Sequence, residues 1–300
     1  MATPQTAIFF EDSTHHYFLE YNLRARWRPE ELRSVLSGVL EECSSSARVM
    51  IAFGPAAWER IAPGAVPDHF IPFYPVLGKH DRTAPGSQGD LLFWIHGSRH
   101  DLNMDLAMRI QRAASELATL ELEVQGFRYL DSRDLTGFID GTENPREREA
   151  REVAVIPEGR PGAGGSFVLS QKWVHDLAAF ERLSVEEQEA VIGRTKADSV
   201  ELEDAPATAH IRRTDVKIDG KALKIYRRSV PYGNLRESGL YFLAFSGELM
   251  RFAIQLDRMF GLSEDGLMDS LTGFSAPVSG SYWYAPPVEA LVDAFGKWQG

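Results

Sequence analysis

The spacing of apolar residues predicts two amphipathic helices in the first half of the chain, within 29–43 and 102–117. In both segments apolar side chains recur every three or four residues, which places them on one helical face. Short apolar runs predict strands near 6–21, 48–53, 90–96 and 120–130. The resulting order, strand-helix-strand-strand-helix-strand, is typical of a ferredoxin-like unit, in which helices cover one face of an antiparallel sheet.

The same order of elements recurs in the second half of the chain. Strands are predicted at 166–172, 223–228, 239–245 and 281–284. The segment Ser184-Val-Glu-Glu187 has the pattern of a capping box that opens a helix, and an apolar stripe from Leu249 to Met259 predicts a further helix. The two halves share no visible sequence identity, so the repeat is one of element order alone.

We therefore predict an α+β fold made of two ferredoxin-like domains, arranged much as in a dimeric α/β barrel. Each domain is expected to be an antiparallel sheet with helices packed on one face. The first domain is placed at residues 1–155 and the second at residues 156–300. The charged stretch 146–151 and the Pro- and Gly-rich stretch 157–165 are interpreted as a surface connection between the two domains.

Composition and charge exclude several classes of protein. The 300 residues include 32 Lys and Arg against 43 Asp and Glu, and the net charge of −11 argues against binding to nucleic acid or to anionic membranes. No apolar run reaches the length of a membrane span. The single cysteine, Cys43, excludes an internal disulfide and is expected to be a buried thiol at the end of the first helix. Because no signal peptide is evident, a cytoplasmic location is expected.

The most informative segment is Gly137-Phe-Ile-Asp-Gly-Thr-Glu-Asn-Pro145, which holds one carboxylate, Asp140, on a turn. Gly137 and Gly141 allow the backbone to approach a bulky partner closely, and Asn144 before the proline favours the end of regular structure. The form GFIDGTENP resembles the GxxDG signature of the dye-decolourising peroxidases. Together with the short chain and the absence of an evident signal peptide, this motif resembles the compact bacterial group of that family, called type B.

This resemblance implies a haem b cofactor, which is iron protoporphyrin IX, and hydrogen peroxide as the oxidising substrate. Small aromatic or dye reductants would then be oxidised through a ferryl-porphyrin radical intermediate. A haem iron needs a proximal ligand, and the family pattern places it at His210, in Ala209-His-Ile-Arg-Arg-Thr-Asp215. His175 is the main rival for the iron, and it could equally contact a haem propionate or cap a turn.

On the other side of the iron, the family pattern assigns the distal arginine to Ile225-Tyr-Arg-Arg-Ser-Val-Pro-Tyr-Gly233. The spacing to Ser229 and Pro231 selects Arg227 as that arginine and Ser229 as its polar neighbour. The adjacent Arg228 would then face the other side of a strand.

The stretch Asp269-Ser-Leu-Thr-Gly-Phe-Ser-Ala-Pro-Val-Ser-Gly280 resembles the C-terminal segment of the family, in which an acid accepts a hydrogen bond from the proximal imidazole. Asp269 stands in the place of that acid, although Asp265 is close enough in the chain to compete. The remaining cofactor contacts implied by the resemblance are Ile139, Gly141, Thr142, Glu143 and Phe245.

These residue types suit the cleavage of peroxide. Asp140 can move a proton between the two peroxide oxygens. Arg227 supplies a permanent positive charge for the leaving oxygen, and His210 backed by Asp269 donates electron density to the iron. The resemblance also implies a homo-oligomer.

Three other interpretations compete with this one. Phe138-Ile-Asp-Gly-Thr142 is similar to the motif of aspartate-nucleophile phosphatases, but Phe138 stands where their nucleophilic acid is required. A haem-binding or haem-iron-handling protein with little turnover would need His210 without Asp140 and Arg227. An interaction module without haem would show no haem absorbance band.

Overall fold

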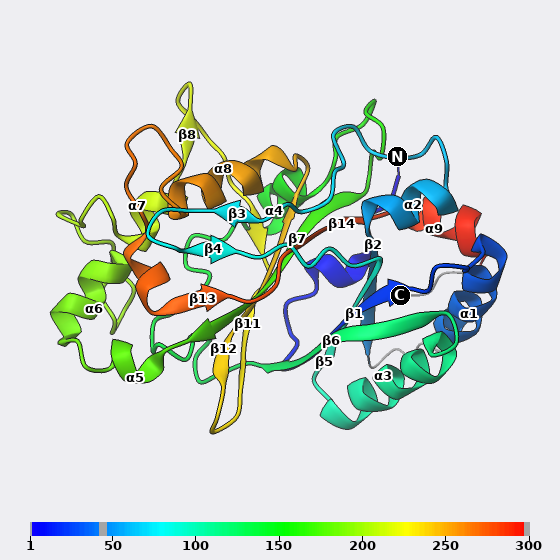
Figure 1. Cartoon of the computed structure of the whole chain (residues 1–300), viewed down its shortest axis with the longest axis horizontal. Coiled ribbons are helices and arrows are strands. Elements are labelled where there is room, and N and C mark those ends of the chain that lie inside the picture. The colour runs from blue at the N-terminus through cyan, green and yellow to red at the C-terminus, as the bar shows by residue number, and fades with distance from the viewer. Residues whose placement is uncertain (1, 42–46, 297–300) are drawn as a thin grey trace.

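The computed structural model describes residues 2–41 and 47–296, which form an α+β fold with one large antiparallel sheet (Figure 1). The strands are β1 (His15–Leu23), β2 (Arg48–Phe53), β3 (Val76–Leu77), β4 (Thr83–Ala84), β5 (Leu91–Gly97), β6 (Ala118–Phe127), β7 (Ser166–His175), β8 (Lys217–Ile218), β9 (Lys221–Ala222), β10 (Tyr226–Arg227), β11 (Val230–Gly233), β12 (Ser238–Ser246), β13 (Ser275–Pro277) and β14 (Ser281–Ala285). The helices are α1 (Pro29–Glu41), α2 (Pro55–Ile61), α3 (His100–Ala114), α4 (Glu147–Ala154), α5 (Leu177–Phe180), α6 (Val185–Ile192), α7 (His210–Thr214), α8 (Met250–Met259) and α9 (Val288–Phe295), with short 3-10 turns η1 (Thr6–Phe9) and η2 (Ser270–Gly273).

Both halves of the large sheet have the ferredoxin-like strand order that the sequence predicts. In the first half the spatial order is β6-β1-β5-β2, and in the second it is β14-β7-β12-β11. In each half the fourth strand in the sequence (β6 or β14) lies beside the first (β1 or β7). The third strand (β5 or β12) lies between the first and the second (β2 or β11). The repeat of element order is therefore a repeat of topology.

Two seams join the halves into a closed ring of eight strands. At one seam Tyr232 of β11 pairs with Gly126 of β6, and at the other Tyr284 of β14 pairs with Phe53 of β2. Closure of a sheet removes its exposed edges. It also creates an inner face, and that face buries a second apolar cluster that includes Phe18, Trp94 and Tyr241.

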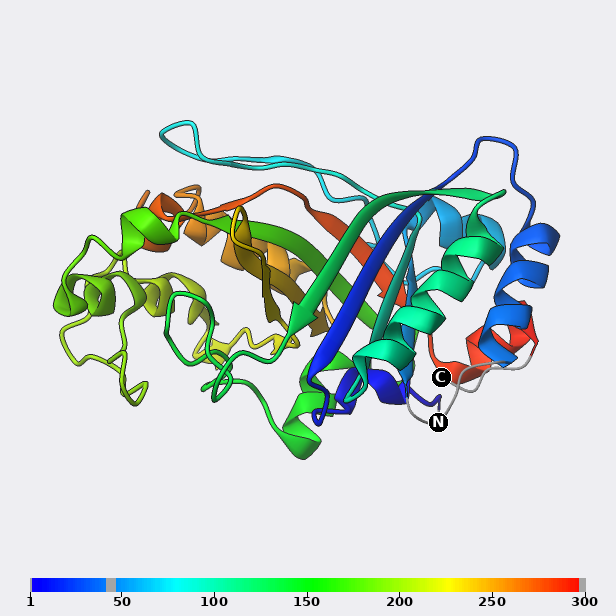
Figure 2. The same ribbon diagram turned by 90° about the horizontal axis from the view of Figure 1, so that it is seen from below.

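Helices cover the outer face of the sheet. In the first half, α3 packs on β1, β5 and β6, and α1 packs on α3 and α9; Figure 2 shows α3 lying along these strands. The predicted helical stripes point to this face, since Leu32, Leu36, Leu106 and Ile110 are buried there. In the second half, α8 buries Phe252, Leu256 and Met259 toward the outer face, while α5, α6 and α7 lie at the far end (Figure 1).

Several elements differ from the predictions. The segment 6–9 is a 3-10 turn whose buried Ala7 and Ile8 pack against β2, and β1 begins only at His15. Residues within 146–151, predicted to be a surface connection, begin helix α4, whose buried small side chains contact β10 and β12. The strand predicted at 223–228 is reduced to Tyr226–Arg227.

Other predictions agree with the structure. Ser184 and Glu187 form the capping box at α6, with reciprocal bonds of 3.2 and 2.8 Å. The first predicted helix ends at Glu41, and Cys43 lies outside the described residues. The domain boundary near residue 155 stays a prediction.

Candidate active site

The outer face of the second half holds an apolar pocket, and the empty space there, counted together with the solvent open to it, is about 1100 Å³. Its floor consists of side chains from β7 and β12, its opposite wall of α8 side chains, and its ends of α7 and the turn around Asp140. Leu169, Leu240, Phe242, Phe252 and Leu256 give the lining its apolar character. A pocket of this kind, with a few convergent polar groups, is the usual form of a cofactor site.

Asp140 and Arg227 lie together at this pocket. One Oδ atom of Asp140 lies 4.0 Å from a guanidinium nitrogen of Arg227, and both side chains are partly exposed, at 32% and 25%. Chain segments almost ninety positions apart are thus brought to one point. Ser229 lines the same pocket, and its Oγ accepts a 3.3 Å hydrogen bond from the Leu243 backbone N–H.

The turn that carries Asp140 is fixed from both sides. Asn144 forms two hydrogen bonds with the backbone of Arg227, each 2.8 Å long, so it ties the turn directly to β10. Gly137 and Gly141 have φ angles of 90° and 80°, which residues with a Cβ atom rarely adopt. Arg133 donates to the carbonyl oxygens of Gly137 and Lys196. Asp140 is therefore presented by a rigid loop.

His210 is the first residue of α7, and it also lines the pocket. Its Nδ1 lies 2.6 Å from Oδ2 of Asp269, a side chain that is fully buried. Asp269 is itself held by the backbone N–H of Leu271, at 2.9 Å. With Nδ1 engaged, Nε2 of His210 is the nitrogen left for a ligand.

The competing residues are engaged elsewhere. Asp265 pairs with the buried Arg213, at 2.7 Å, and not with His210, and this guanidinium holds the pKa of Asp265 well below its usual range. Arg228 donates to the carbonyl oxygens of Ile8 and Phe10 and lies over the ring of Trp94, on the barrel side of the sheet.

His175 also lines the pocket, but both of its ring nitrogens have partners. Nε2 lies 3.1 Å from Oδ1 of Asp134, and Nδ1 lies 2.7 Å from Oγ of Ser275. Burial raises the pKa of Asp134, but hydrogen bonds from His175 and Thr136 outweigh this effect, and the net pKa is below its ordinary value. His175 therefore joins the Asp140 loop to the end of β7.

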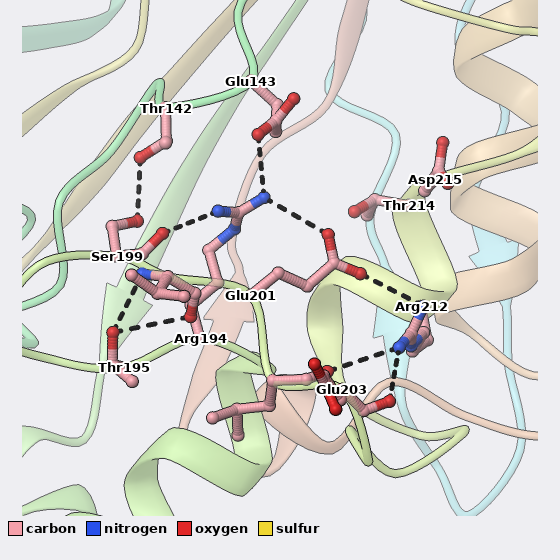
Figure 3. A network of polar contacts seen from close by, with 12 residues as sticks. Thr142, Glu143, Arg194, Thr195, Ser199, Glu201, Glu203, Arg212, Thr214 and Asp215 are labelled. Atoms are coloured by element: carbon pink, nitrogen blue, oxygen red, sulfur yellow. Dashed lines mark hydrogen bonds and ion pairs between the residues drawn. The ribbon is translucent and has the colours of Figure 1, made fainter.

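The solvent-facing mouth of the pocket is a second, polar cavity, which Gly141, Thr142 and Glu143 line. Arg194 also lines this cavity, and Figure 3 shows its guanidinium group between Ser199, to whose carbonyl oxygen it donates at 2.7 Å, and Glu143, to which it donates at 3.1 Å. Thr142 lies 2.8 Å from Ser199 through their hydroxyl groups. This mouth combines acidic groups with a buried arginine.

A polar network beside it continues toward α7. Glu201 lies 3.7 Å from Arg194 and 3.1 Å from Arg212, so one carboxylate bridges two guanidinium groups (Figure 3). Arg212 also donates to the carbonyl oxygen of Glu203, at 3.2 Å.

Phe245 does not lie at the pocket. Successive side chains of a strand point to opposite faces, and on β12 the residues Leu240 and Phe242 face the pocket. Phe245 shares the other face with Tyr241 and Leu243, inside the barrel. The structure thus brings together every predicted site residue except Phe245, with Gly141, Thr142 and Glu143 at the mouth.

The residues present fit a haem. The apolar chamber suits the porphyrin, the open mouth with Arg194 suits its carboxylate groups, and Nε2 of His210, a residue that lines the chamber, would suit as a ligand to the iron. The Nε2 of Gln171 is a buried amide nitrogen on the pocket floor without a protein partner, which indicates a ligand or water on that side.

Sequence reasoning missed Arg194, Asn144 and Gln171. Asn144 stands within the motif and could have been examined as a backbone clamp, because Asn side chains often bond to nearby backbone. Arg194 and Gln171 carry no local signal, since their roles depend on segments that meet only in the folded chain.

Comparisons with known proteins agree with this geometry. Residues 5–128 match the family model described as Dyp-type peroxidase, N-terminal, and residues 131–290 match the model described as Dyp-type peroxidase, C-terminal. A dye-decolorizing peroxidase of Mycobacterium tuberculosis is 39% identical over 249 residues, which cover 81% of this chain and 74% of that protein. A second, from Mycolicibacterium paratuberculosis, is 40% identical over 248 residues, with 81% and 70% of the two chains covered.

Solved structures are similar over the whole chain. A putative Dyp-type peroxidase from Shewanella oneidensis has a TM-score of 0.91 at 33% identity, and the match covers 100% of both chains. A Rhodococcus jostii DypB variant in complex with heme has a TM-score of 0.89 at 35% identity, with 99% of each chain covered.

Within residues 2–41 and 47–296, no helix has the length and apolar character needed to cross a membrane.

The pocket geometry, the two matching family models and the relatives lead to one conclusion. The chain belongs to the dye-decolourising peroxidase family and is a haem peroxidase that acts on dyes.

Proposed function

We propose that this peroxidase reduces hydrogen peroxide in the space between Asp140, Arg227 and Ser229 on one side and His210 on the other. The observation that carries this proposal is that one pocket is lined by a histidine with a free Nε2 and by an acid–arginine pair. Bound haem supplies a redox-active iron at this place. The oxidised substrates would be dyes and small aromatic reductants.

Asp140 acts as the proton carrier. Its carboxylate takes the proton from one peroxide oxygen and returns it to the other oxygen, which then leaves as water. Arg227, 4.0 Å away, supplies a positive charge and stabilises the negative charge that develops on the leaving oxygen. The backbone clamp from Asn144 preserves the spacing of the two groups.

His210 would hold the iron through Nε2, and Asp269 fixes the ring orientation through Nδ1. A buried carboxylate against Nδ1 makes the imidazole a stronger donor toward a metal. Arg194 at the mouth is placed to pair with the carboxylate groups of a porphyrin, because guanidinium and carboxylate match in geometry.

A third cavity reaches Asp140 and Arg227 from the barrel side and includes Ser229, His16 and Arg128 in its lining. It offers small molecules such as peroxide a path that does not cross the mouth near Arg194. Ser229 stands where this cavity meets the apolar pocket and would hold water or peroxide there.

The test is the rate of reaction with peroxide in Asp140→Asn, measured by stopped-flow absorbance of the haem. The amide keeps the shape of the side chain but does not take the proton, so the second-order rate constant should fall about 100- to 10,000-fold. An unchanged rate constant would reject the role of Asp140.

The alternative, a haem-handling protein with little turnover, needs neither Asp140 nor Arg227 beside the pocket. The family relationship and the distal pair favour the peroxidase. A cytoplasmic location and a homo-oligomer stay predictions, which cell fractionation and sedimentation velocity test directly.

A further inference from the structure

The barrel interior holds a carboxylate that the peroxide site does not use. Glu20 lies on β1 and is 3% exposed, and its Oε1 accepts hydrogen bonds from Tyr241 at 2.6 Å and from Ser170 at 2.9 Å. Burial raises the pKa of Glu20, so this carboxylate holds a proton more firmly than an exposed one. Burial of an ionisable group costs free energy unless pairing and hydrogen bonds offset the loss of hydration.

Tyr241 is fully buried, and its hydroxyl group donates to Glu20. Burial raises the pKa of Tyr241 well above its ordinary value, and the nearby carboxylate raises it further. The phenol therefore stays protonated under all ordinary conditions. It can lose its proton to Glu20 only if it also loses an electron, because a phenol that loses an electron becomes a strong acid.

This pair lies directly behind the floor of the haem pocket. Tyr241 stands on β12 between Leu240 and Phe242, both of which line the pocket. Ser170 stands on β7 between Leu169 and Gln171, which also line it. Because side chains alternate across a strand, the phenol is separated from the cofactor by the thickness of one sheet.

Other aromatic side chains in the barrel are less suited to lose an electron. The Arg228 guanidinium lies 5.1 Å from the Trp94 ring, and this positive charge opposes a second one on the indole. Trp283 donates its N–H to Ser170 at 2.8 Å, and a hydroxyl group is a weak proton acceptor. Tyr232 donates to the Trp173 carbonyl oxygen, at 3.2 Å, and although Glu237 is near, the Lys172 ammonium lies 5.1 Å from the ring and opposes a positive charge on it.

Tyr226 is the closest parallel, because it also donates to a carboxylate, Glu11, at 2.9 Å. However, Glu11 is exposed, and Arg228 lies 3.4 Å from the Tyr226 oxygen. Both features oppose the loss of an electron from Tyr226, since water and the guanidinium weaken the pull of the carboxylate. Tyr226 therefore serves as a matched control.

We propose that Tyr241 and Glu20 form an internal redox pair, in which Tyr241 gives one electron to the oxidised haem and its proton to Glu20. Reduction of one hydrogen peroxide withdraws two electrons from the enzyme. When no reducing substrate is present, Tyr241 returns one of them, and its O–H proton moves along the 2.6 Å hydrogen bond to Oε1 of Glu20. A later reductant returns an electron to the phenoxyl oxygen, and the proton moves back.

The test is electron paramagnetic resonance of the haem-loaded protein, frozen shortly after mixing with one equivalent of peroxide and no reductant. Wild-type protein should give a tyrosyl radical signal. Tyr241→Phe should reduce this signal at least fivefold, and Tyr226→Phe should leave it unchanged. Glu20→Gln keeps Tyr241 and a hydrogen-bond acceptor but removes the base, so the signal should also fall at least fivefold.

Stopped-flow absorbance of the haem is recorded for the same proteins. The rate of the first absorbance change after mixing with peroxide should be the same in wild type and in all three variants, because none of these side chains lines the pocket. The decay of that first oxidised species should slow in Tyr241→Phe and in Glu20→Gln, since the internal electron donor or its base is lost. Loss of the radical signal with an unchanged first step thus separates this inference from the roles proposed for Asp140 and Arg227. A full tyrosyl signal in Tyr241→Phe or in Glu20→Gln, or none in wild type, would overturn the proposal.

Discussion

The first and second halves of the molecule have the same strand order, but they use the outer face of the sheet in different ways. In the first half, α1 and α3 fill that face with Leu32, Leu36, Leu106 and Ile110. In the second half, α8 leaves space above β7 and β12, and this space is the apolar pocket.

The difference arises from the connection between the first two strands of each half. In the first half that connection is essentially helix α1. In the second half residues 176–225 separate β7 from β10 and contain α5, α6 and α7, with His210 at the start of α7. One fold thus supports a packed half and a half with a pocket, called here the functional half. The residues proposed for the chemistry lie in its longer connection, on β10 and in the loop before α4.

The largest expected effect is loss of the cofactor from the functional half. His210→Ala should abolish or strongly weaken haem binding, because it removes the proposed iron ligand. His175→Ala is the control and should keep the haem absorbance band, since both ring nitrogens of His175 bond to protein groups. Titration of the haem-free protein with hemin measures both. Equal hemin affinity in His210→Ala and wild type would contradict the assignment.

The adjacent arginines sharpen the comparison at a single strand. Arg227→Leu should lower the rate constant for peroxide about 100- to 1,000-fold, as expected for loss of one preorganised charge. Arg228→Leu should leave this constant nearly unchanged, because Arg228 binds carbonyl oxygens on the barrel side. If the two variants exchanged these results, the assignment would have to be reversed.

A core substitution in the packed half should affect stability alone. Ile110 is 1% exposed on α3, and Ile110→Ala should lower the free energy of unfolding by about 2 to 5 kcal/mol. The haem spectrum and the rate with peroxide should not change in the folded variant. Urea denaturation and stopped-flow absorbance measure the two properties, and a large loss of rate would show that the halves are not separate in function.

The smallest expected effect concerns Asp134 and the pH dependence of stability. The pKa of Asp134 is lower in the folded protein than in the unfolded chain, so its contribution is present above the unfolded pKa and is lost as the pH falls through the folded pKa. Asp134→Asn should therefore cost about 1 to 3 kcal/mol at neutral pH and less in acid. Urea denaturation of wild type and Asp134→Asn at neutral and at acidic pH tests this prediction. A loss of unfolding free energy that is larger in acid than at neutral pH would contradict it.

Much of this comparison could be predicted from the sequence. The apolar periods locate β2, β5, β7, α1, α3 and α8, because burial of one face imposes them. The element order in turn implies two ferredoxin-like halves. Asp140, Arg227 and Ser229 stand in distinctive peptides, and the structure brings them to one pocket.

The remaining features depend on contacts that the sequence does not display. Helix α4 was missed because only three small side chains, Ala150, Val153 and Ala154, face the sheet, and its other residues are charged or exposed. Phe245 was predicted at the cofactor site but lies inside the barrel, because the face of β12 on which it lies follows from the register of the whole strand. Arg194 lies at the mouth only because residues 142–143 and 199–201 fold around it.

The central claim is that peroxide reacts in the functional half, between His210 and the Asp140–Arg227 pair. The most direct measurement is stopped-flow absorbance of the haem-loaded Asp140→Asn, Arg227→Leu double variant, mixed with one equivalent of peroxide. The account predicts that the variant keeps its haem band through His210 but reacts at least about 100-fold more slowly than wild type. A double variant that reacts as fast as wild type would contradict it.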